Sequence, residues 1–327
     1  MRRTVLAVAL ATVLAPTASA SSALDSREAA AEFHRWQAKE ARLFAIGWRL
    51  VTGNAPFCEG SAPAIGLLLH DAGSYARPEA VRAALGLSGD IGVQAVAQGS
   101  QAEGVGLQVN DTLVSANGTA MAAMPLDAGK PWSRLASVNA VIDESLRQDG
   151  RAALRWRSPA GEETMAEIHG IPACPSRFEL LSGSDRVSAD GTRVLLGEAF
   201  AGFGYSDELL AAAVAHELAH NLLRHRAQLD ARGRSQANVR ATEREADRMM
   251  PWLLANAGYP PEAAVEFMRR WGPNSPGGVL GGIMRARTHD GWDERADMMA
   301  AELPAIAAAM AAKGKADWRA QFQLRET

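Results

Sequence analysis

The hydrophobic residues of the N-terminal segment recur at helical spacing. Within residues 26–55 they fall on one side of a helix at these positions: Phe33, Trp36, Leu43, Ile46 and Leu50. Ser26 is a suitable N-cap, and the Gly-Asn pair at 53–54 ends the pattern. The sequence therefore predicts one long helix over residues 26–55, with no chemistry of its own.

Between about residues 84 and 170 the pattern changes to the short alternation typical of strands. DTLVSANG, residues 111–118, predicts a strand that ends in an Asn-Gly turn. AALRWR and ETMAEI flank the turn residues SPAG and predict a hairpin. One helix, residues 137–150, precedes this hairpin and ends at Gly150. The segment is thus predicted to be a compact β-rich module.

A third pattern, hydrophobic on nearly every side, begins at Ser206. SDELLAAAVAHELAHNLLRH, residues 206–225, has Asp207 and Glu208 in its first turn, where acidic side chains favour a helix start. Its polar residues share one stripe, so we expect a buried helix that forms one wall of a cleft. Together the three patterns predict an α+β fold, mainly helical with a small sheet edge, into which the β-rich module is inserted.

Composition and charge narrow the class of protein. The chain has 327 residues, of which 47% are hydrophobic, and a formal net charge of −3. This length allows two domains, and the charge gives no basic surplus for binding nucleic acid. Residues 1–20 combine Arg2 and Arg3, a short apolar run and a small-residue cleavage site at 18–20. They predict a cleaved signal peptide, and hence a periplasmic or secreted protein without a stable membrane span.

The chain has two cysteines, Cys58 and Cys174. In an exported protein this low, even number favours one disulfide, which would close the chain around the β-rich module. Two buried free thiols are the alternative.

The helix that begins at Ser206 carries a candidate metal site. His216 and His220 lie four residues apart on one helical face, with Glu217 beside them. Two neutral imidazoles can bind zinc, and Glu217 can then act as a general base on water. Glu243 is the candidate third ligand, and Asp247, four residues later, can accept a hydrogen bond from a ligand histidine. The expected cofactor is one zinc ion per chain.

Other side chains compete less well for this site. On a continuous helix His225 lies about 140° from His220, and Glu245 about 200° from Glu243, so neither is expected to join the ligands. The alternative for Glu243 is an exposed carboxylate that pairs with Arg240 or Arg244.

A resemblance applies to the β-rich module. SQAEGVGLQVNDTLVSANG, residues 100–118, is similar to bacterial PDZ domains, through these residues: Gly106, Leu107, Asp111, Asn117 and Gly118. The resemblance implies a groove between a strand and the late helix, where a peptide ligand adds as a further strand. The peptide-binding residues are then expected in the loop and strand 88–96, namely Gly89, Asp90, Ile91 and Gly92. The negative charge of Asp90 opposes capture of a terminal carboxylate, and a spacer without a ligand is the alternative.

A second resemblance covers about residues 176–305. His-Glu-x-x-His followed by Glu-x-x-Ala-Asp resembles the CAAX prenyl endopeptidase family, in particular its soluble bacterial envelope members, some of which carry a PDZ module before the zinc helix. NAGYPPEAAVEFMRRW and RTHDGWDER are similar to later segments of that family. The resemblance makes His289 or Arg295, and less strongly Tyr205, candidates to support the oxyanion. Asp290 departs from the proline that the family often has. The chain lacks the membrane helices of the prenyl proteases, so prenylated substrates are not implied.

The combined expectation is an exported zinc endopeptidase that hydrolyses peptide bonds of envelope proteins. Its predicted parts are the signal peptide, an N-terminal helical part at 21–83, the PDZ module at 84–170 and the catalytic domain at 171–327. Residues 192–197 are expected to be an edge strand that holds a polypeptide substrate. Residues 226–240 are expected to be a solvated loop. The expected partners are the polypeptide substrate and a peptide ligand of the module.

Two other functions stay open. The chain can be a peptide-binding or chaperone-like envelope protein with a latent or structural zinc site, although such a site does not need the base Glu217. It can also belong to another lineage of zinc peptidases, such as the thermolysin-like enzymes.

Overall fold

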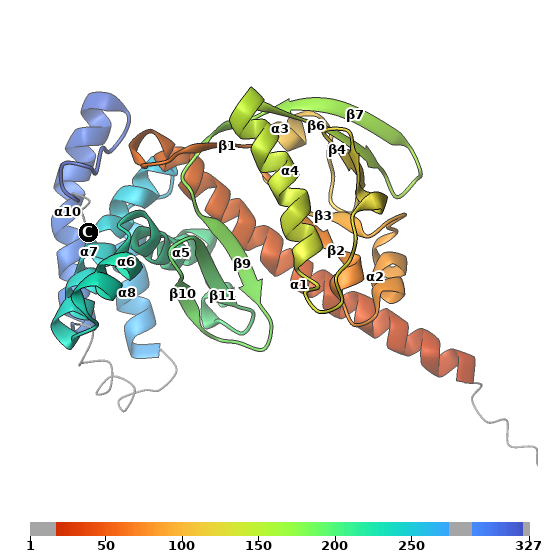
Figure 1. Ribbon diagram of the computed structural model, residues 1–327. Helices are drawn as coiled ribbons and strands as arrows, with labels where there is room; N and C mark the ends of the chain where they lie inside the picture. Colours follow the sequence, from red (N-terminus) through yellow and green to blue (C-terminus); the bar gives the residue numbers. More distant parts are fainter. Residues whose placement is uncertain (1–17, 275–289, 323–327) are drawn as a thin grey trace, which may run out of the picture.

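One long helix, α1 (Ala18–Asn54), runs along both halves of the molecule (Figure 1). The computed structural model describes residues 18–274 and 290–322. Helix α1 ends where the Gly-Asn pair predicts, but it begins eight residues before Ser26. Neither proline nor glycine stands between Ala18 and Ser26, so nothing in the sequence forces a start there. The greater part of the predicted signal peptide lies outside the described residues.

The β-rich module, residues 65–170, is an antiparallel sheet with α4 (Ser133–Asp149) packed on it. Its strands follow the order β2-β3-β4-β6-β7, and β5 pairs with β4. Their bounds are β2 (Leu67–Asp71), β3 (Ile91–Val96), β4 (Thr112–Ala116), β5 (Thr119–Ala120), β6 (Arg151–Arg157) and β7 (Glu163–His169). Short helices α2 (Pro78–Leu85) and α3 (Gln101–Gly104) complete it. Because β2 belongs to this sheet, the module starts before residue 84.

Local turn chemistry explains the hairpins of the module. Asn117 and Gly118 have φ of 47° and 80°, the left-handed values of the two-residue turns that join antiparallel strands. Gly150, at φ 69°, ends α4 in the same region of conformation and leads directly into β6. The predicted strand 111–118, helix 137–150 and hairpin are all present.

The second half of the molecule is mainly helical. Helices α5 (Asp207–Leu222), α7 (Gln236–Asn256), α8 (Glu262–Asn274) and α10 (Trp292–Lys313) pack together with α1, and α6 (His225–Arg232) joins α5 to α7. A three-stranded sheet in the order β10-β11-β9 covers one side of α5; its bounds are β9 (Arg177–Leu181), β10 (Val187–Ala189) and β11 (Arg193–Gly197). The expected α+β architecture is therefore observed.

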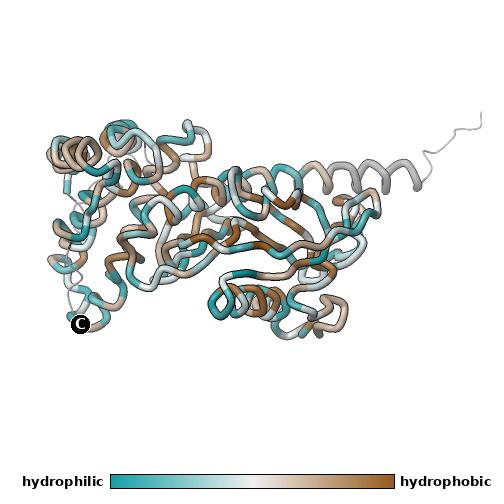
Figure 2. Tube along the Cα trace, turned by 90° about the horizontal axis from the view of Figure 1, so that it is seen from above, coloured by the Kyte–Doolittle hydropathy of each residue, from teal (hydrophilic) through white to brown (hydrophobic). Residues whose placement is uncertain are grey.

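Each half has its own hydrophobic core. One core joins α1, β9, β11 and the helices, and the other lies between α4 and the strands of the module. Figure 2 shows hydrophobic stretches both in the helices at one end and in the strands of the module. Within the described residues, no helix combines the length and the apolar character needed to cross a membrane.

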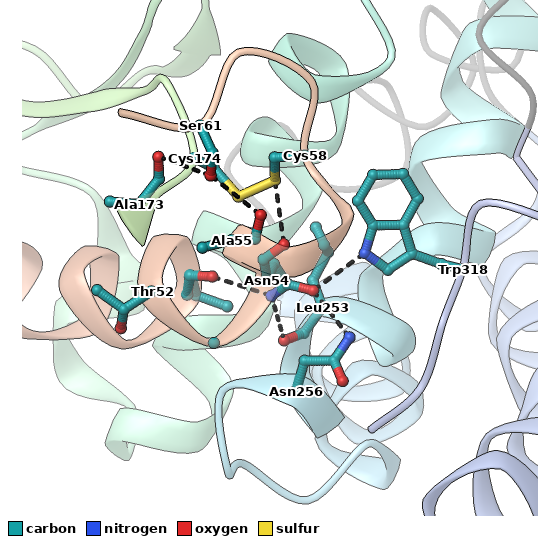
Figure 3. Close-up of a disulfide and its surroundings, with 12 residues drawn as sticks. Thr52, Asn54, Ala55, Cys58, Ser61, Ala173, Cys174, Leu253, Asn256 and Trp318 are labelled. Carbon is teal, nitrogen blue, oxygen red and sulfur yellow. Dashed lines mark hydrogen bonds between the residues drawn. A yellow bond between two sulfur atoms is a disulfide. The ribbon is translucent and has the colours of Figure 1, made fainter. Parts of the chain in front are cut away.

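The predicted disulfide between Cys58 and Cys174 is present, with a Cα–Cα distance of 5.5 Å (Figure 3). Beside it β1 (Ala62–Ala64) pairs with β8 (Ile171–Ala173), so both chain crossings into the module are held together. Asn54 lies next to this bond and is fully buried. Its side-chain oxygen accepts hydrogen bonds from Asn256 (3.0 Å) and Trp318 (3.1 Å), which ties the end of α1 to α7 and to the C-terminal segment.

Helix α1 also contacts the module along its side. Gln37 donates a hydrogen bond of 2.9 Å to Asn110, and Gln94 donates one of 2.5 Å to Glu40. Three turns nearer its end, Arg49 bonds the backbone oxygen of Ala257 at 3.2 Å. The module is thus fixed at two places, by the disulfide-linked base and by the side of α1.

Candidate metal centre

Two packed helices, α5 and α7, bring the three predicted ligands together. His216 Nε2 lies 3.2 Å from His220 Nε2. The Glu243 carboxylate reaches both rings, at 3.3 Å from His216 Nε2 and 3.6 Å from His220 Nε2. Within the described ranges these three side chains form the one group of histidine, cysteine and acidic residues with the spacing to hold a metal ion.

The spacing of these donor atoms suits a small tetrahedral ion. Ligand atoms about 2.0–2.1 Å from a tetrahedral zinc ion lie about 3.3 Å from one another. His216 Nε2 lies 3.2 Å from His220 Nε2 and 3.3 Å from Glu243 Oε2, and His220 Nε2 lies 3.6 Å from the other oxygen, Oε1; all three separations are close to that value. Two imidazoles and one carboxylate also form a ligand set of catalytic zinc sites, which leave a fourth position open. The predicted ligand cluster is therefore confirmed as a group that can hold a metal ion, while zinc itself stays a prediction.

His216 is supported from behind by a buried ion pair. Its Nδ1 lies 3.0 Å from Asp247 Oδ1, although the ring is not turned into line for a regular hydrogen bond. Asp247 accepts hydrogen bonds of 2.6 and 2.7 Å from Nε and Nη2 of Arg295. Burial works to raise the pKa of Asp247, but Arg295 and His216 hold that pKa below its usual range. Asp247 is thus an ionised partner at the position predicted for it.

The charges around the two histidines differ. Burial works to lower the pKa of His216, but the nearby carboxylates of Asp247 and Glu243 raise it to about 10. Burial lowers the pKa of His220 to about 3. The two carboxylates beside these rings favour a cation between them. A metal ion there competes with the proton of His216 for the same lone pair.

Glu217 faces a cavity of about 920 Å³ together with the three ligand side chains. Burial raises the pKa of Glu217 to about 7; among the nearby charges His216 and Arg295 oppose this rise and Glu243 adds to it. A carboxyl group with a pKa near neutrality can both accept and release a proton. The position and the pKa of Glu217 therefore suit the general base that the sequence predicts.

The strand beside the cavity differs from the prediction. β11 lies between β10 and β9, so residues 192–197 have no free edge, and the prediction of an edge strand there is wrong. The free edge belongs to β10, and Val187, Ser188 and Ala189 line the cavity. Asp190 causes this arrangement, since its carboxylate accepts hydrogen bonds from the backbone of Thr192 (2.9 Å) and turns the chain back into a hairpin.

Asn221 fixes the sheet relative to α5. This buried side chain accepts a hydrogen bond of 2.8 Å from the backbone of Gly191 and donates one of 3.0 Å to Ser176. The polar stripe of α5 therefore serves the cavity at one end and the sheet at the other.

The residues predicted to support the oxyanion differ in where they lie relative to the cavity. Arg295 lines the cavity, but its Nε and Nη2 groups are engaged by Asp247, so it supports His216 through that carboxylate. Tyr205 packs on Phe267 and Trp271 and is not part of the described cavity lining. His289 lies outside the described residues. Asp290 is bonded by Arg244, the neighbour of Glu243, at 2.5 and 2.8 Å.

The predicted peptide-binding residues of the module do not lie on a free edge. β3, which begins with Ile91 and Gly92, has β2 on one side and β4 on the other. The edge strands of this sheet are β2 and β7, and of these β2 packs against α4. Asp90 is occupied as well, because Arg82 and Arg134 bond its carboxylate at 2.5 and 2.8 Å. A groove between a free strand edge and α4 would therefore run along β2 and not along Ile91 and Gly92.

His225 and Glu245, which were not expected to join the ligands, lie directly behind His220. His225 Nδ1 is 2.9 Å from His220 Nδ1, and His225 Nε2 is 3.3 Å from Glu245. The angle of about 140° between His220 and His225 applies to one continuous helix, but α5 ends at Leu222 and Arg224 takes a left-handed conformation with φ 55°. Helix α6 begins after this turn, so the expected loop 226–240 is largely helical. No feature of the sequence marks the turn, because arginine seldom adopts that conformation.

Comparison of the chain with protein-family models, with curated proteins and with solved structures finds no match.

Proposed function

We propose that this chain is a zinc-dependent endopeptidase that hydrolyses peptide bonds of other proteins. The observation that carries the proposal is the meeting of four side chains in one cavity: His216, His220 and Glu243 with metal-ligand spacing, and Glu217 beside them. A site that only stabilised the fold would have no use for a carboxyl group with a pKa of about 7 facing the same cavity.

His216, His220 and Glu243 would hold the ion. Zinc in such a site polarises a carbonyl group and lowers the pKa of water to about 7. Glu217 takes a proton from the attacking water while the water oxygen bonds to the carbonyl carbon. Glu217 then delivers that proton to the nitrogen of the breaking C–N bond, so the carboxylate is regenerated.

The cavity walls suit an extended polypeptide. The free edge of β10 offers backbone groups to a substrate strand, which orients the chain across the site. The lining of the cavity also includes apolar and aromatic side chains, namely Phe200, Ala213, Met250, Phe267 and Trp271. We infer a preference for a large apolar side chain next to the cleaved bond.

The wider proposal follows the two resemblances. The chain would be a soluble, envelope-located relative of the CAAX prenyl endopeptidase family, with a PDZ-type module that recognises a substrate or regulator peptide along β2. The disulfide supports an oxidising compartment, since such bonds persist in secreted and periplasmic proteins.

The test is a comparison of the zinc-loaded chain with Glu217→Gln on an unfolded protein substrate. Glutamine keeps the size of the side chain but cannot accept the proton. We expect the variant to retain one zinc per chain by metal analysis and to lose cleavage by about two to four orders of magnitude, the range of general-base effects. Near-normal turnover by the metal-loaded variant would reject Glu217 as the base.

The same assay separates the alternative function. A chain that binds zinc and unfolded peptides but cleaves none of them, with or without Glu217, is a binding or chaperone-like protein with a latent site. Zinc-dependent cleavage that a chelator abolishes and added zinc restores would exclude that alternative.

A further inference from the structure

The proposed reaction makes no use of two side chains behind His220, buried His225 and partly exposed Glu245. His225 is 1% exposed and is the first residue of α6, and Glu245 lies two residues after the ligand Glu243 on α7. Their side chains form a chain of contacts that starts at the rear nitrogen of His220: 2.9 Å from His220 Nδ1 to His225 Nδ1, and 3.3 Å from His225 Nε2 to Glu245.

We propose that His225 and Glu245 are positioning residues, which keep the proton of His220 on Nδ1 and thereby leave its Nε2 free for the metal. The proposal concerns how the metal site is held, and it rests on the proposed function only through the role of His220 as a ligand.

The protons can be placed step by step. Two imidazole nitrogens that face each other at 2.9 Å share one proton, which belongs to either His220 or His225. If His220 Nδ1 holds it, His225 Nδ1 accepts it, and neutral His225 carries its own proton on Nε2, facing the Glu245 carboxylate. Each donor and acceptor that links His220, His225 and Glu245 then has a partner.

The opposite arrangement of two neutral rings fails at the far end. If His225 Nδ1 holds the proton, its Nε2 is bare and turns a lone pair toward the Glu245 carboxylate at 3.3 Å. Two acceptors would then face each other, and the bare nitrogen of His225, a residue that is 1% exposed, would have no donor, which is unfavourable. The proton of His220 would also sit on Nε2, where the metal must bind. Glu245 therefore selects the tautomer of a ligand that it does not touch.

This support parallels the one on the other ligand. Asp247 stands directly behind His216 Nδ1 at 3.0 Å and is anchored by Arg295. His220 is backed in the same way, but its carboxylate acts through an intervening histidine. Partners of this kind orient metal ligands, and their removal commonly weakens metal binding about 10- to 100-fold.

Two substitutions of His225 test the proposal. His225→Phe keeps a ring but removes both nitrogens, whereas His225→Asn places an amide oxygen near the position of Nδ1. We expect His225→Phe to bind zinc about 10- to 100-fold more weakly in a chelator competition. His225→Asn should recover most of the affinity, because its oxygen can accept the His220 proton. A merely structural role would not distinguish an acceptor in this way.

A second pair of variants leaves His225 in place. Glu245→Ala removes the acceptor for His225 Nε2 and should weaken zinc binding in the same direction, whereas Glu245→Gln retains a carbonyl oxygen and should remain close to the wild type. The matched control is His70→Phe, which removes another buried histidine, in the module, and should leave zinc affinity unchanged. If His225→Phe does not fold, the Glu245 pair decides the question alone.

The tautomer can be read without metal or activity. In the metal-free, histidine-labelled chain, nitrogen NMR should find the proton of His220 on Nδ1 in the wild type and a mixture in His225→Phe. A proton on His220 Nε2 in the wild type, or unchanged zinc affinity in both folded His225→Phe and Glu245→Ala, would overturn the proposal. Zinc binding with the expected tautomer but no peptide cleavage would instead reject the proposed function and leave this inference standing.

Discussion

Three acidic residues of helix α7 contact different sets of histidines at the candidate metal centre. On α7, Glu243 faces both histidine rings, Asp247 stands behind His216, and Glu245 turns toward His225. In the sequence, Glu243 and Glu245 differ only in the direction in which their side chains leave the helix. Only the packing of α5 and α6 against α7 gives Glu245 a role.

Glu243→Ala should therefore weaken zinc binding more than Glu245→Ala. The first substitution removes a donor atom, so its loss should exceed the about 10- to 100-fold expected of a supporting residue. Metal content after dialysis against a weak chelator measures both variants side by side. Equal zinc retention in the two would contradict the assignment of Glu243 as the third ligand.

At the scale of elements, the junction of α5 and α6 decides where His225 points. Arg224 has φ 55°, and its side chain forms an exposed ion pair with Glu59 at 2.9 Å. Such a surface pair contributes little to stability, so the backbone conformation is the important feature of this residue.

Two substitutions of Arg224 should have opposite outcomes. Glycine adopts a positive φ freely, so Arg224→Gly should keep the turn, the thermal midpoint and the zinc affinity close to wild type. Proline fixes φ near −65°, so Arg224→Pro should displace α6, destabilise the fold by more than about 1 kcal/mol and weaken zinc binding. Zinc affinity that is unaffected by proline would mean that α6 is not needed to hold His220.

A second junction between elements is the ion cluster at the start of α4. Arg134, 9% exposed, bonds Asp71 at the end of β2 at 2.7 Å and Asp90 at 2.8 Å. Burial works to raise the pKa of Asp90, but Arg134 and Arg82 hold that pKa below its usual range. The cluster joins α4 to the end of β2 and to the loop before β3.

Asp90→Asn should lower the free energy of unfolding by about 1 kcal/mol at neutral pH, a modest value because the side chain is partly exposed. A carboxyl group whose pKa is depressed by folding stabilises above its unfolded pKa, about 3.9, and loses this effect as the pH falls through the folded value. The difference from wild type should thus be full at about pH 6 and shrink below about pH 4 in urea titrations. Glu167→Gln, in an exposed pair with Arg151, is the control and should change little; a penalty for Asp90→Asn that grows with acid would contradict the pairing.

On the scale of the whole molecule, the β-rich module is an insertion closed at its base. The disulfide and the β1–β8 pairing bring the two chain crossings together, while α1 supports the module from the side. Because Ala64 and Ile171 are paired residues, their Cα atoms lie about 5 Å apart, and a short linker can join them.

Deletion of residues 65–170 should leave a folded chain that binds zinc, since the metal centre and its core lie wholly outside the module. Phe33 on α1 would lose cover, so Phe33→Ser in the same variant keeps that face polar. The range 84–170 is the unsuitable choice, because it would leave β2 without its sheet. Circular dichroism and metal analysis measure the outcome, and an unfolded deletion variant would show that the helical half cannot fold without the module.

The deletion also changes what the disulfide contributes. It shortens the separation of the cysteines from 116 residues to about 10. Chain entropy then predicts that reduction destabilises the full chain by about 5 kcal/mol but the shortened chain by about 3 kcal/mol. Equal losses on reduction, measured by denaturant titration, would mean that the bond acts mainly through its surroundings in the folded state.

The sequence by itself determined the features that depend on neighbours along the chain. Hydrophobic spacing located α1, α4 and α5, and Asn117-Gly118 located a turn, because helix and strand periods and turn dihedrals are local properties. The spacing of His216 and His220 placed two ligands on one face for the same reason. The prediction of Glu243 as the third ligand needed the further assumption that a second helix packs against the first.

Tertiary structure decided which group faces which. The sequence pattern did not distinguish the free edge of β10 from the central strand β11, nor that of β2 from β3, because a strand pattern records burial of its faces and says nothing about hydrogen-bond partners at its edges. It also could not find the support of His220. One left-handed residue, Arg224, reverses the chain there, and hydrogen bonds between buried polar groups follow from that reversal and from the packing of three helices.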